Sequence, residues 1–369
     1  MVYFSAILNI EMRILGIESS CDETAAAVVQ DGSHLLSNVV HTQIDIHAKY
    51  GGVVPEVAAR SHIETIIPVI DQALGESNST WDDIDAIAVT HAPGLSGSLL
   101  IGATSAKTIA HLKNKPLLPI HHVQAHVYAS FITEQSDNLS LKLPAEQPEF
   151  PLLTLIVSGG HSQLVIFHSH ENFEILGQTQ DDAVGEAFDK VAKILGLPYP
   201  GGPSISRAAE SGNEDAYVLP ISRLDSPYNF SFSGLKTAVL RAVQKEMGVD
   251  FTFPSHELKT LLNDVQRCDF AASFQKAAVE ALVRPTVRAI EEFNPKSLVV
   301  AGGVAANLKL RQTLESRSSI KVTYPPVELC TDNAAMVASL AYFQAKHQPA
   351  SDPLNLDITP SMSMSEIYN

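Results

Sequence analysis

Short apolar runs alternate with longer stretches of helical spacing along most of the chain. Runs such as RILGIE, LLTLIV, QLVIF and SLVVA predict buried strands, because they are short, rich in branched residues and bounded by glycine or polar residues. Apolar positions three or four residues apart predict helices over 182–195, 234–246, 268–293 and 333–344. Strands that alternate with helices in this way are typical of an α/β fold.

Two segments share one pattern of strand, tight polar turn and second strand. Residues 14–30 turn at Ser19-Ser20-Cys21-Asp22, and residues 152–168 turn at Ser158-Gly159-Gly160-His161-Ser162. Turns of this kind can bring backbone N–H groups close to a phosphate or a carboxylate. The repetition predicts a duplicated domain with a cleft between the copies. Two unrelated hairpins are the alternative, and the pattern alone does not decide between them.

Changes in composition suggest a division of the chain. Residues 1–12 form an N-terminal extension, for which translation from an upstream start is the preferred explanation and a targeting role the second. The polar, proline-containing segment 134–150 is expected to link a first α/β domain, residues 13–133, to a second one, residues 151–344, which carries a helical insertion. Residues 345–369 are expected to form a loose C-terminal tail.

Composition and charge narrow the class of protein. Of 369 residues, 45% are apolar and 18% charged, which supplies a large core and excludes a disordered chain or a coiled coil. Three scattered cysteines make a disulfide framework unexpected, and no apolar run reaches membrane-spanning length, so a soluble cytoplasmic protein without a membrane partner is expected. With 25 basic and 41 acidic side chains the net charge is −16, which is unfavourable for RNA binding. Any RNA contact needs a local basic face, such as one within 223–311, or a partner.

A histidine cluster is the most informative local feature. In His121-His122-Val123-Gln124-Ala125-His126, the second and third histidines are four residues apart at a predicted helix start, so they share one helix face. This spacing suits two imidazole ligands of one metal. Because cysteine is scarce, the third ligand is expected to be a carboxylate and the metal zinc or ferrous iron. A solvated or helix-capping histidine cluster is the alternative.

The best-placed carboxylate by local pattern is Asp332 in Cys330-Thr331-Asp332-Asn333, just before a predicted helix. Aspartate is also an ordinary N-cap at such a position, and the sequence alone does not bring Asp332 to the histidines. A metallopeptidase is disfavoured, because the zinc-protease pattern HExxH places its general base where Val123 stands.

Nucleotide-binding patterns of the usual kinds are missing: the sequence contains neither GxxxxGK[ST] nor GxGxxG. Glycine-bearing turns remain at 158–160, 200–203 and 301–304, and Asn307 follows the last at an apparent helix start that could meet a phosphate or a sugar hydroxyl. Asp189 is a polar residue on a predicted helix whose regularly spaced residues are otherwise apolar. Plain turns and a solvated helix face are the alternatives.

Taken in order, nine motifs resemble those of one family, the tRNA threonylcarbamoyladenosine-forming transferases, called TsaD in bacteria and formerly known as glycoproteases. They cover residues 13 to about 340. The motifs are RILGIESSCDET (13–24), HAKYGGVVPEVAARSH (47–62), APGLSGSLLIGA (92–103), HHVQAH (121–126), LIVSGGHSQL (155–164), DDAVGEAFDKVAKILGLPYPGGP (181–203), FSFSGLKTA (230–238), AGGVAAN (301–307) and CTDNAAM (330–336).

The resemblance implies a fold and a site. The fold is α/β, with two duplicated domains like those of actin and hexokinase (the ASKHA fold) around a central nucleotide cleft. One divalent metal per subunit, iron(II) in the first place and zinc(II) as the alternative, is implied at His122, His126 and Asp332. The implied contacts to the substrate are Ile156, Val157, Ser158, Gly159, Gly160, Asp189, Gly202 and Asn307.

The resemblance also implies a reaction and partners. Threonylcarbamoyl passes from threonylcarbamoyl-AMP to the N6 amine of the adenosine 3′ of the anticodon, in tRNAs that read codons beginning with A. Asp22 or Glu23 is a hypothetical acceptor of the amine proton. The implied partners are tRNA, a metal-site-lacking paralogue (TsaB-like) and a small ATPase (TsaE-like). That this chain is itself the non-catalytic paralogue is a third possibility, which its intact metal residues argue against.

Two positions depart from the family pattern. Ala92 stands where relatives commonly have glycine, and Ser206 stands where many have an aspartate that contacts the substrate, so no substrate role is carried over to Ser206.

Overall fold

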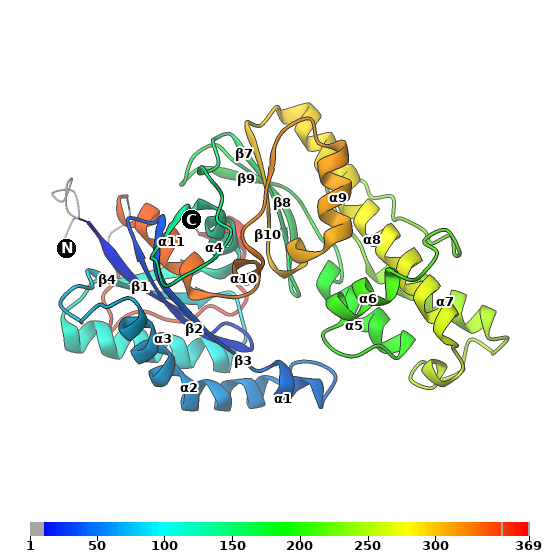
Figure 1. Ribbon diagram of the computed structural model, residues 1–369, viewed down its shortest axis with the longest axis horizontal. Coiled ribbons are helices and arrows are strands. Elements are labelled where there is room, and N and C mark those ends of the chain that lie inside the picture. The colour runs from blue at the N-terminus through cyan, green and yellow to red at the C-terminus, as the bar shows by residue number, and fades with distance from the viewer. Residues whose placement is uncertain (1–10, 348–349, 368–369) are drawn as a thin grey trace.

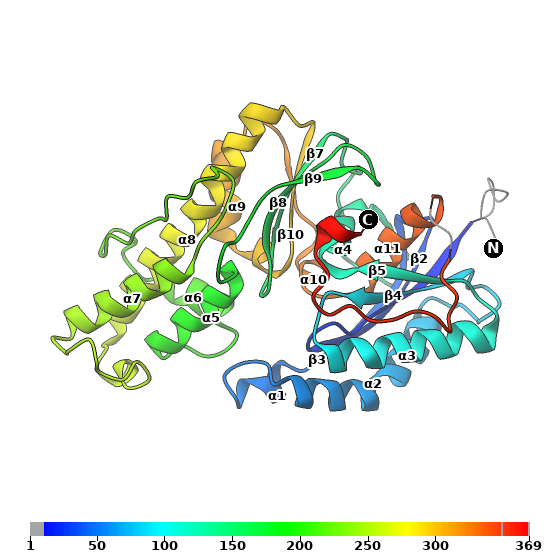
Figure 2. The ribbon, with the colours of Figure 1, turned by 180° about the vertical axis from the view of Figure 1, so that it is seen from behind.

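The computed structural model describes residues 11–347 and 350–367, which form two α/β halves side by side (Figures 1 and 2). The first half is built on a six-stranded sheet with the order β5-β4-β1-β2-β3-β6. Its strands are β1 (Arg13–Glu18), β2 (Glu23–Gln30), β3 (His34–Thr42), β4 (Ala86–Ala92), β5 (Leu117–His121) and β6 (Glu134–Gln135).

The second half repeats the first. Its sheet has the order β11-β10-β7-β8-β9, formed by β7 (Leu152–Val157), β8 (Ser162–Phe167), β9 (Phe173–Gln178), β10 (Ser297–Ala301) and β11 (Val322–Thr323). In both sheets the first three strands form an antiparallel meander, and two further strands add in parallel beside the first. The duplication predicted from the two hairpins is confirmed, and with it the ASKHA-like α/β class.

Burial explains why these segments are strands. β1 and β7 are buried along nearly their whole length, as expected for central strands covered on both faces. Helices α2 (Pro55–Glu76) and α3 (Ser96–Lys113) cover one face of the first sheet, while α4 (His122–Tyr128) and α11 (Ala334–Ala345) lie between the two sheets (Figure 1). α11 buries every residue except Tyr342, so it is apolar all round rather than amphipathic.

Helices α5 to α9 of the second half lie beyond its sheet, whereas α10 lies at the junction with the first half (Figure 2). The four helices predicted from apolar spacing are all present, with ends shifted by a few residues, as α5, α7, α8 and α11. The remaining bounds are α1 (Ile44–Ala48), α5 (Val184–Leu195), α6 (Gly201–Ala209), α7 (Ser233–Glu246), α8 (Asp264–Phe293), α9 (Leu308–Arg317) and α10 (Val327–Cys330), with 3₁₀ turns at Ala129–Phe131, Leu258–Thr260, Gly303–Ala306 and Met364–Glu366.

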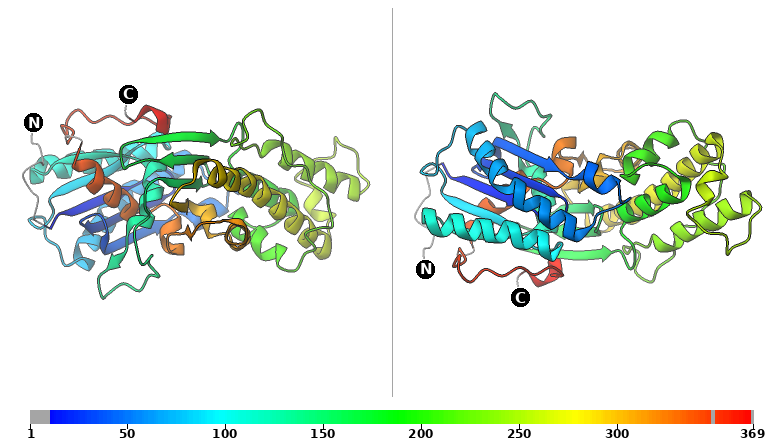
Figure 3. Two further views of the ribbon diagram at one scale, coloured as in Figure 1. Left: turned by 90° about the horizontal axis from the view of Figure 1, so that it is seen from above. Right: turned by 90° about the horizontal axis from the view of Figure 1, so that it is seen from below.

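The domain limits stay predictions, and two segments differ from expectation. α11, assigned to the second domain, packs against β1, β2 and α4 of the first. The C-terminal segment is not loose, because residues 350–367 run back along the first half (Figure 3). There the Ser351 and Thr359 N–H groups donate to the carbonyls of Leu117 and His91, both at 2.9 Å. Backbone hydrogen bonds do not require apolar side chains at regular intervals. The sequence of this segment therefore lacks the periodicity of a helix or a strand, and for that reason it suggested a loose tail.

Three further expectations concern chemistry and placement. Cys21, Cys268 and Cys330 are all free thiols, in agreement with their scatter. No helix in the described part of the chain combines the length and apolarity needed to cross a bilayer. Of the expected N-terminal extension, residues 1–10 lie outside the described residues.

Candidate metal and substrate site

Helix α4 positions the two histidines predicted to bind metal. The helix starts directly after β5, and the ring of His121 caps it by accepting the Gln124 N–H at 3.5 Å. His122 and His126 then lie one turn apart on the same face, with ring centroids 4.7 Å apart in an edge-to-face arrangement. Both side chains are buried, which excludes the alternative of a solvated histidine cluster.

Asp332 reaches the histidines from the other side, on the connection that runs from the second sheet through α10 to α11. Its Oδ1 atom lies 3.5 Å from Nε2 of His122 and 3.4 Å from Nε2 of His126. Asn333, rather than Asp332, caps α11, since its side chain accepts the Met336 N–H at 3.0 Å. The aspartate is therefore available for another purpose than capping.

The electrostatics of this group favour a bound cation. Both ring nitrogens of His126 are buried: Nδ1 has no hydrogen-bond partner among the described residues, and Nε2 faces Asp332 Oδ1 at 3.4 Å without the geometry of a regular hydrogen bond. Burial by itself would lower the pKa of His122, but the carboxylates of Asp332 and Glu18 raise it to about 9. Burial opposes ionisation of Asp332, yet the neighbouring His122 and His126 hold its pKa at about 2. One ligand atom from each residue lies within 4.8 Å of the others, so His122, His126 and Asp332 could hold a metal.

The turn between β7 and β8 is open to a ligand. The Ser158 N–H and the His161 N–H close it, donating to the His161 carbonyl at 2.8 Å and to Ser158 Oγ at 3.1 Å. Gly159 and Gly160 are exposed, and a Cβ added to either would meet no atom within 4 Å. The side chains of Ile156 and Val157 are fully buried in the core. These two residues can therefore offer a ligand only their backbone groups.

Two predicted substrate residues lie on α5 and α6. Asp189 is held by the Gly201 N–H, which donates to its Oδ1 at 2.7 Å. Burial raises the pKa of Asp189, the hydrogen bond from the Gly201 N–H opposes this rise, and the negative charge of Asp22 in the first half adds to it. A Cβ added to Gly202 would meet no atom within 4 Å, so the space beside this residue is open.

Asn307 is already fully engaged. Its amide donates to Ser206 Oγ at 3.0 Å and to Gln275 Oε1 at 2.9 Å, while its Oδ1 accepts the Leu310 N–H at 3.0 Å. In this structure Asn307 acts as the N-cap of α9, and its contact with substrate remains a prediction.

The first hairpin turn brings Asp22 and Glu23 toward the same group. Burial raises the pKa of Glu23 well above its usual range, and the carboxylates of Asp332 and Asp22 raise it further. Three other residues belong to this neighbourhood, although neither their residue types nor their spacing predicts a role. They are Glu18, His161 and Tyr199, which all lie within the nine family motifs. Their motif positions were the only available signal.

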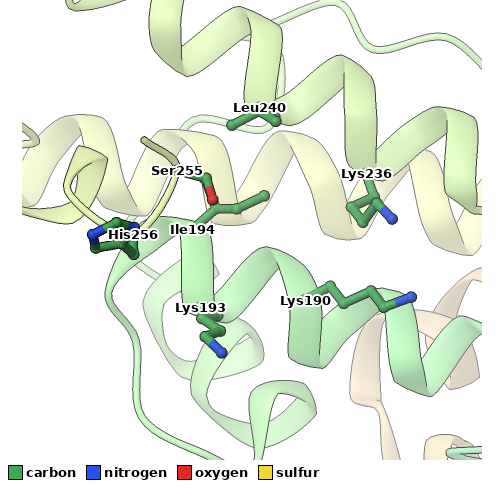
Figure 4. A pocket seen from close by; sticks show the side chains of 7 residues that line it. All are labelled: Lys190, Lys193, Ile194, Lys236, Leu240, Ser255 and His256. Atoms are coloured by element: carbon green, nitrogen blue, oxygen red, sulfur yellow. The ribbon is translucent and has the colours of Figure 1, made fainter. Parts of the chain in front are cut away.

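A separate small cavity lies between α5 and α7, and its lining includes three lysines and the apolar side chains of Ile194 and Leu240 (Figure 4). Its volume is about 230 Å³. Lys190 and Lys236 both contact Asp182 Oδ2, at 2.9 and 3.4 Å. The lining residues are Lys190, Lys193, Ile194, Lys236, Leu240, Ser255 and His256.

Fold and site together define a class: proteins with two related α/β halves and, at their junction, two buried histidines beside a partly buried aspartate. Residues 34–339 match the family model described as TsaD, tRNA N6-adenosine threonylcarbamoyltransferase. The chain belongs to this TsaD family.

Relatives from several bacteria support the assignment over nearly the full chain. The Thermomicrobium roseum protein is 49% identical over 354 residues, which cover 94% of this chain and 95% of that protein. The Dehalococcoides mccartyi protein (strain BAV1) is 48% identical, with 96% and 100% covered, and that of Symbiobacterium thermophilum is 49% identical, with 96% and 97% covered. All three are named tRNA N6-adenosine threonylcarbamoyltransferase.

Solved structures agree on the fold alone. Full-length HypF in its phosphate- and nucleotide-bound form has a TM-score of 0.54 at 14% identity, covering 92% of this chain and 47% of HypF. HypF of T. kodakarensis has a TM-score of 0.53 at 14% identity, with 92% and 49% covered.

Proposed function

We propose that this chain transfers threonylcarbamoyl from threonylcarbamoyl-AMP to the N6 amine of the adenosine 3′ of the anticodon, in tRNAs that read codons beginning with A. The products are N6-threonylcarbamoyladenosine and AMP. The observation that carries the proposal is the group of His122, His126 and Asp332, with both histidines buried, beside two hairpin turns in a chain of the TsaD family. A peptidase is disfavoured, because the zinc-protease pattern HExxH requires a glutamate at the position that Val123 occupies.

The open turn at Ser158, Gly159 and Gly160 is the proposed seat of the donor. Exposed glycines allow the donor to approach the backbone, and the N–H groups can stabilise negative charge that develops on the carbamoyl oxygen. Ile156 and Val157 would contribute through their backbone. Asp189, Gly202 and Asn307 would complete the pocket from α5, α6 and the start of α9.

A divalent cation, iron(II) first and zinc(II) second, would be held by His122, His126 and Asp332 and would supply Lewis-acid polarisation of the donor carbonyl. The chain's own task there is orientation. The histidines are fixed by α4 between two sheets, so the ligand side chains need little reorganisation.

Proton removal is assigned to the first hairpin. As the amine nitrogen bonds to the carbamoyl carbon, the bond from that carbon to the AMP oxygen breaks, and one N6 proton must leave. Glu23 is the proposed acceptor, with Asp22 as the alternative, because the raised pKa of Glu23 makes its carboxylate a stronger base than usual.

We further propose that tRNA contacts the lysine-lined cavity between α5 and α7. A chain with a net charge of −16 needs a local cationic surface for RNA. At this cavity, on and beside the helix that carries Asp189, three lysines stand against the two carboxylates of Asp182 and Glu186, which leaves a net positive charge: Lys190, Lys193 and Lys236. The substitutions Lys193→Gln and Lys236→Gln would raise the KM for tRNA and reduce the salt dependence of tRNA binding, without changing the affinity for metal.

The proposed protein partners are the TsaB-like paralogue and the TsaE-like ATPase, acting with this chain in the cytoplasm. Support for a subunit contact comes from exposed isoleucines one helical turn apart on α2: Ile63 and Ile67 are 60% and 52% exposed. Leu100 on the adjacent α3 is 53% exposed. Apolar side chains grouped on neighbouring helices are typical of interfaces.

The test is incorporation of labelled threonine into tRNA by the purified protein with its helper proteins, ATP and bicarbonate. Wild type is compared with His122→Ala/His126→Ala and with His111→Ala, an exposed histidine on α3 that serves as control. We expect incorporation by wild type and the control and its loss in the double variant. Incorporation by the double variant would discard the metal mechanism, and none by wild type beside a competent control enzyme would overturn the transferase.

A further inference from the structure

Glu18 is a charged side chain with no exposure to solvent. It is the last residue of β1, directly before the first hairpin turn, and its relative exposure is 0%. A buried carboxylate is costly unless donors compensate its charge. The identity of its donors therefore indicates what the position requires.

Both oxygens of Glu18 are occupied. Oε1 accepts the backbone N–H of Ser20 at 2.6 Å, and Oε2 accepts the hydroxyl of the buried Thr90 on β4 at 2.5 Å. Oε2 also lies 3.1 Å from Nδ1 of His122. The hydroxyl of Ser20 lies at the same 3.1 Å from that nitrogen. The first hairpin thus grips the His122 ring on the side away from Asp332.

We propose that Glu18 is a positioning residue of the metal site, which holds a proton of His122 on Nδ1 so that Nε2, which faces Asp332 and His126, is the nitrogen that binds the metal. The proposal rests on the proposed function only in taking these three residues as metal ligands. A histidine ligand commonly donates its second N–H to a carboxylate, which fixes both the tautomer and the ring orientation. Glu18 supplies that carboxylate, and Thr90 fixes the orientation of Glu18.

The geometry makes Glu18→Gln a sharp test, since glutamine has nearly the same shape. The Ser20 N–H can only donate, so the glutamine oxygen must face it. The amide NH₂ then faces Thr90 and His122. The Thr90 hydroxyl can rotate to accept, but His122 can accept only through an unprotonated Nδ1. In the neutral ring this places the proton on Nε2, where it blocks the metal.

The experiment is competition for Zn²⁺ between a chromogenic chelator and the purified full-length protein. We expect Glu18→Gln to bind Zn²⁺ about 10- to 100-fold more weakly than wild type. Ser19→Ala is the matched control: its buried hydroxyl donates to the Ser98 carbonyl at 2.9 Å and does not contact His122. Its zinc affinity is expected to equal that of wild type.

Two further measurements separate positioning from folding. Thermal unfolding of the metal-free proteins should show Glu18→Gln folded at the assay temperature. Glu18→Asp, which keeps the charge but withdraws it from His122, should give an intermediate affinity and serves as the test variant if Glu18→Gln does not fold. Long-range ¹H–¹⁵N spectra of the zinc-loaded wild type should show His122 protonated on Nδ1.

Wild-type zinc affinity in both Glu18 variants, an unprotonated Nδ1 in the loaded wild type, or a wild type that binds no zinc would each overturn the proposal. Failure of the proposed function gives a different result. If the double histidine variant still incorporated threonine while Glu18→Gln lost zinc affinity, the metal would be positioned by Glu18 but not needed for transfer.

Discussion

Gly185→Ala tests whether the turn between β7 and β8 holds the donor, without removing any polar group. Gly185 is the second residue of α5, and its N–H donates to the Ser158 carbonyl of that turn at 3.3 Å. A Cβ placed on it would lie 2.6 Å from the Ser158 carbonyl oxygen and 2.8 Å from the Cα of Gly159. Ordinary contacts begin near 3.4 Å, so the turn has to retreat by about 0.6–0.8 Å.

The expected effect follows from that displacement. A misplacement of about 1 Å in a positioning element can cost about 100-fold in rate. We therefore expect kcat/KM for the donor to fall about 10- to 100-fold, or about 1.4–2.7 kcal/mol of transition-state stabilisation. The assay is steady-state transfer with threonylcarbamoyl-AMP varied at saturating tRNA. Crowding should also reduce the free energy of unfolding by about 1–3 kcal/mol, measured by chemical denaturation.

Gly75→Ala is the matched control, because a Cβ at Gly75, near the end of α2, meets no atom within 4 Å. It should raise the free energy of unfolding by up to about 1 kcal/mol through helix propensity and leave the kinetics unchanged. A Gly185→Ala enzyme that stays folded with kcat/KM within twofold of wild type would refute the placement of the donor at this turn.

The remaining predictions concern charge. Asp332→Asn should weaken metal binding at least 10-fold, measured by chelator competition. It should also lower the pKa of His122 in the metal-free protein from about 9, because the Asp332 carboxylate that raises this pKa is gone. An unchanged NMR titration of His122 would contradict the second expectation. His170 is stacked on Phe343, and its pKa is lowered to about 4, mainly by burial and further by the charges of Lys346 and His347. Between pH 6.5 and 4 the folded protein therefore binds fewer protons than the unfolded chain. Stability should fall as pH drops through that window, by about 1–2 kcal/mol after discounting the full shift of about 3.4 kcal/mol for partial exposure. Denaturation of His170→Phe at pH 7.5 and 4.5 checks this, and an equal acid loss in the variant would exclude His170 as its cause.

Local chemistry was predictable wherever one element contains the whole signal. The spacing of His122 and His126 needs only a helix to bring them together, and the helix is present. The hairpin at residues 14–30 and its counterpart at 152–168 needed only strand period and turn residues, and both have the expected antiparallel pairing.

Long-range placement was not predictable in the same way. Asp332 read equally well as a helix cap, and only the cap made by Asn333 and the packing of α11 against the first sheet remove that ambiguity. In the sequence, Glu18 is only the polar residue at the end of a predicted strand. No sequence pattern shows that Thr90 and His122 converge on it. The C-terminal segment is held through backbone hydrogen bonds, which leave no trace in side-chain pattern.

The origin of the three ligand side chains has a consequence for motion. His122 and His126 follow an edge strand of the first sheet, whereas Asp332 lies at the end of the connection from the second. A cation held by all three joins the end of this connection to α4, and any motion of the connection that separates Asp332 from α4 must weaken the binding of the cation. Thermodynamic linkage then requires reciprocity: a substrate that favours the closed arrangement tightens the cation by the same factor by which the cation tightens the substrate.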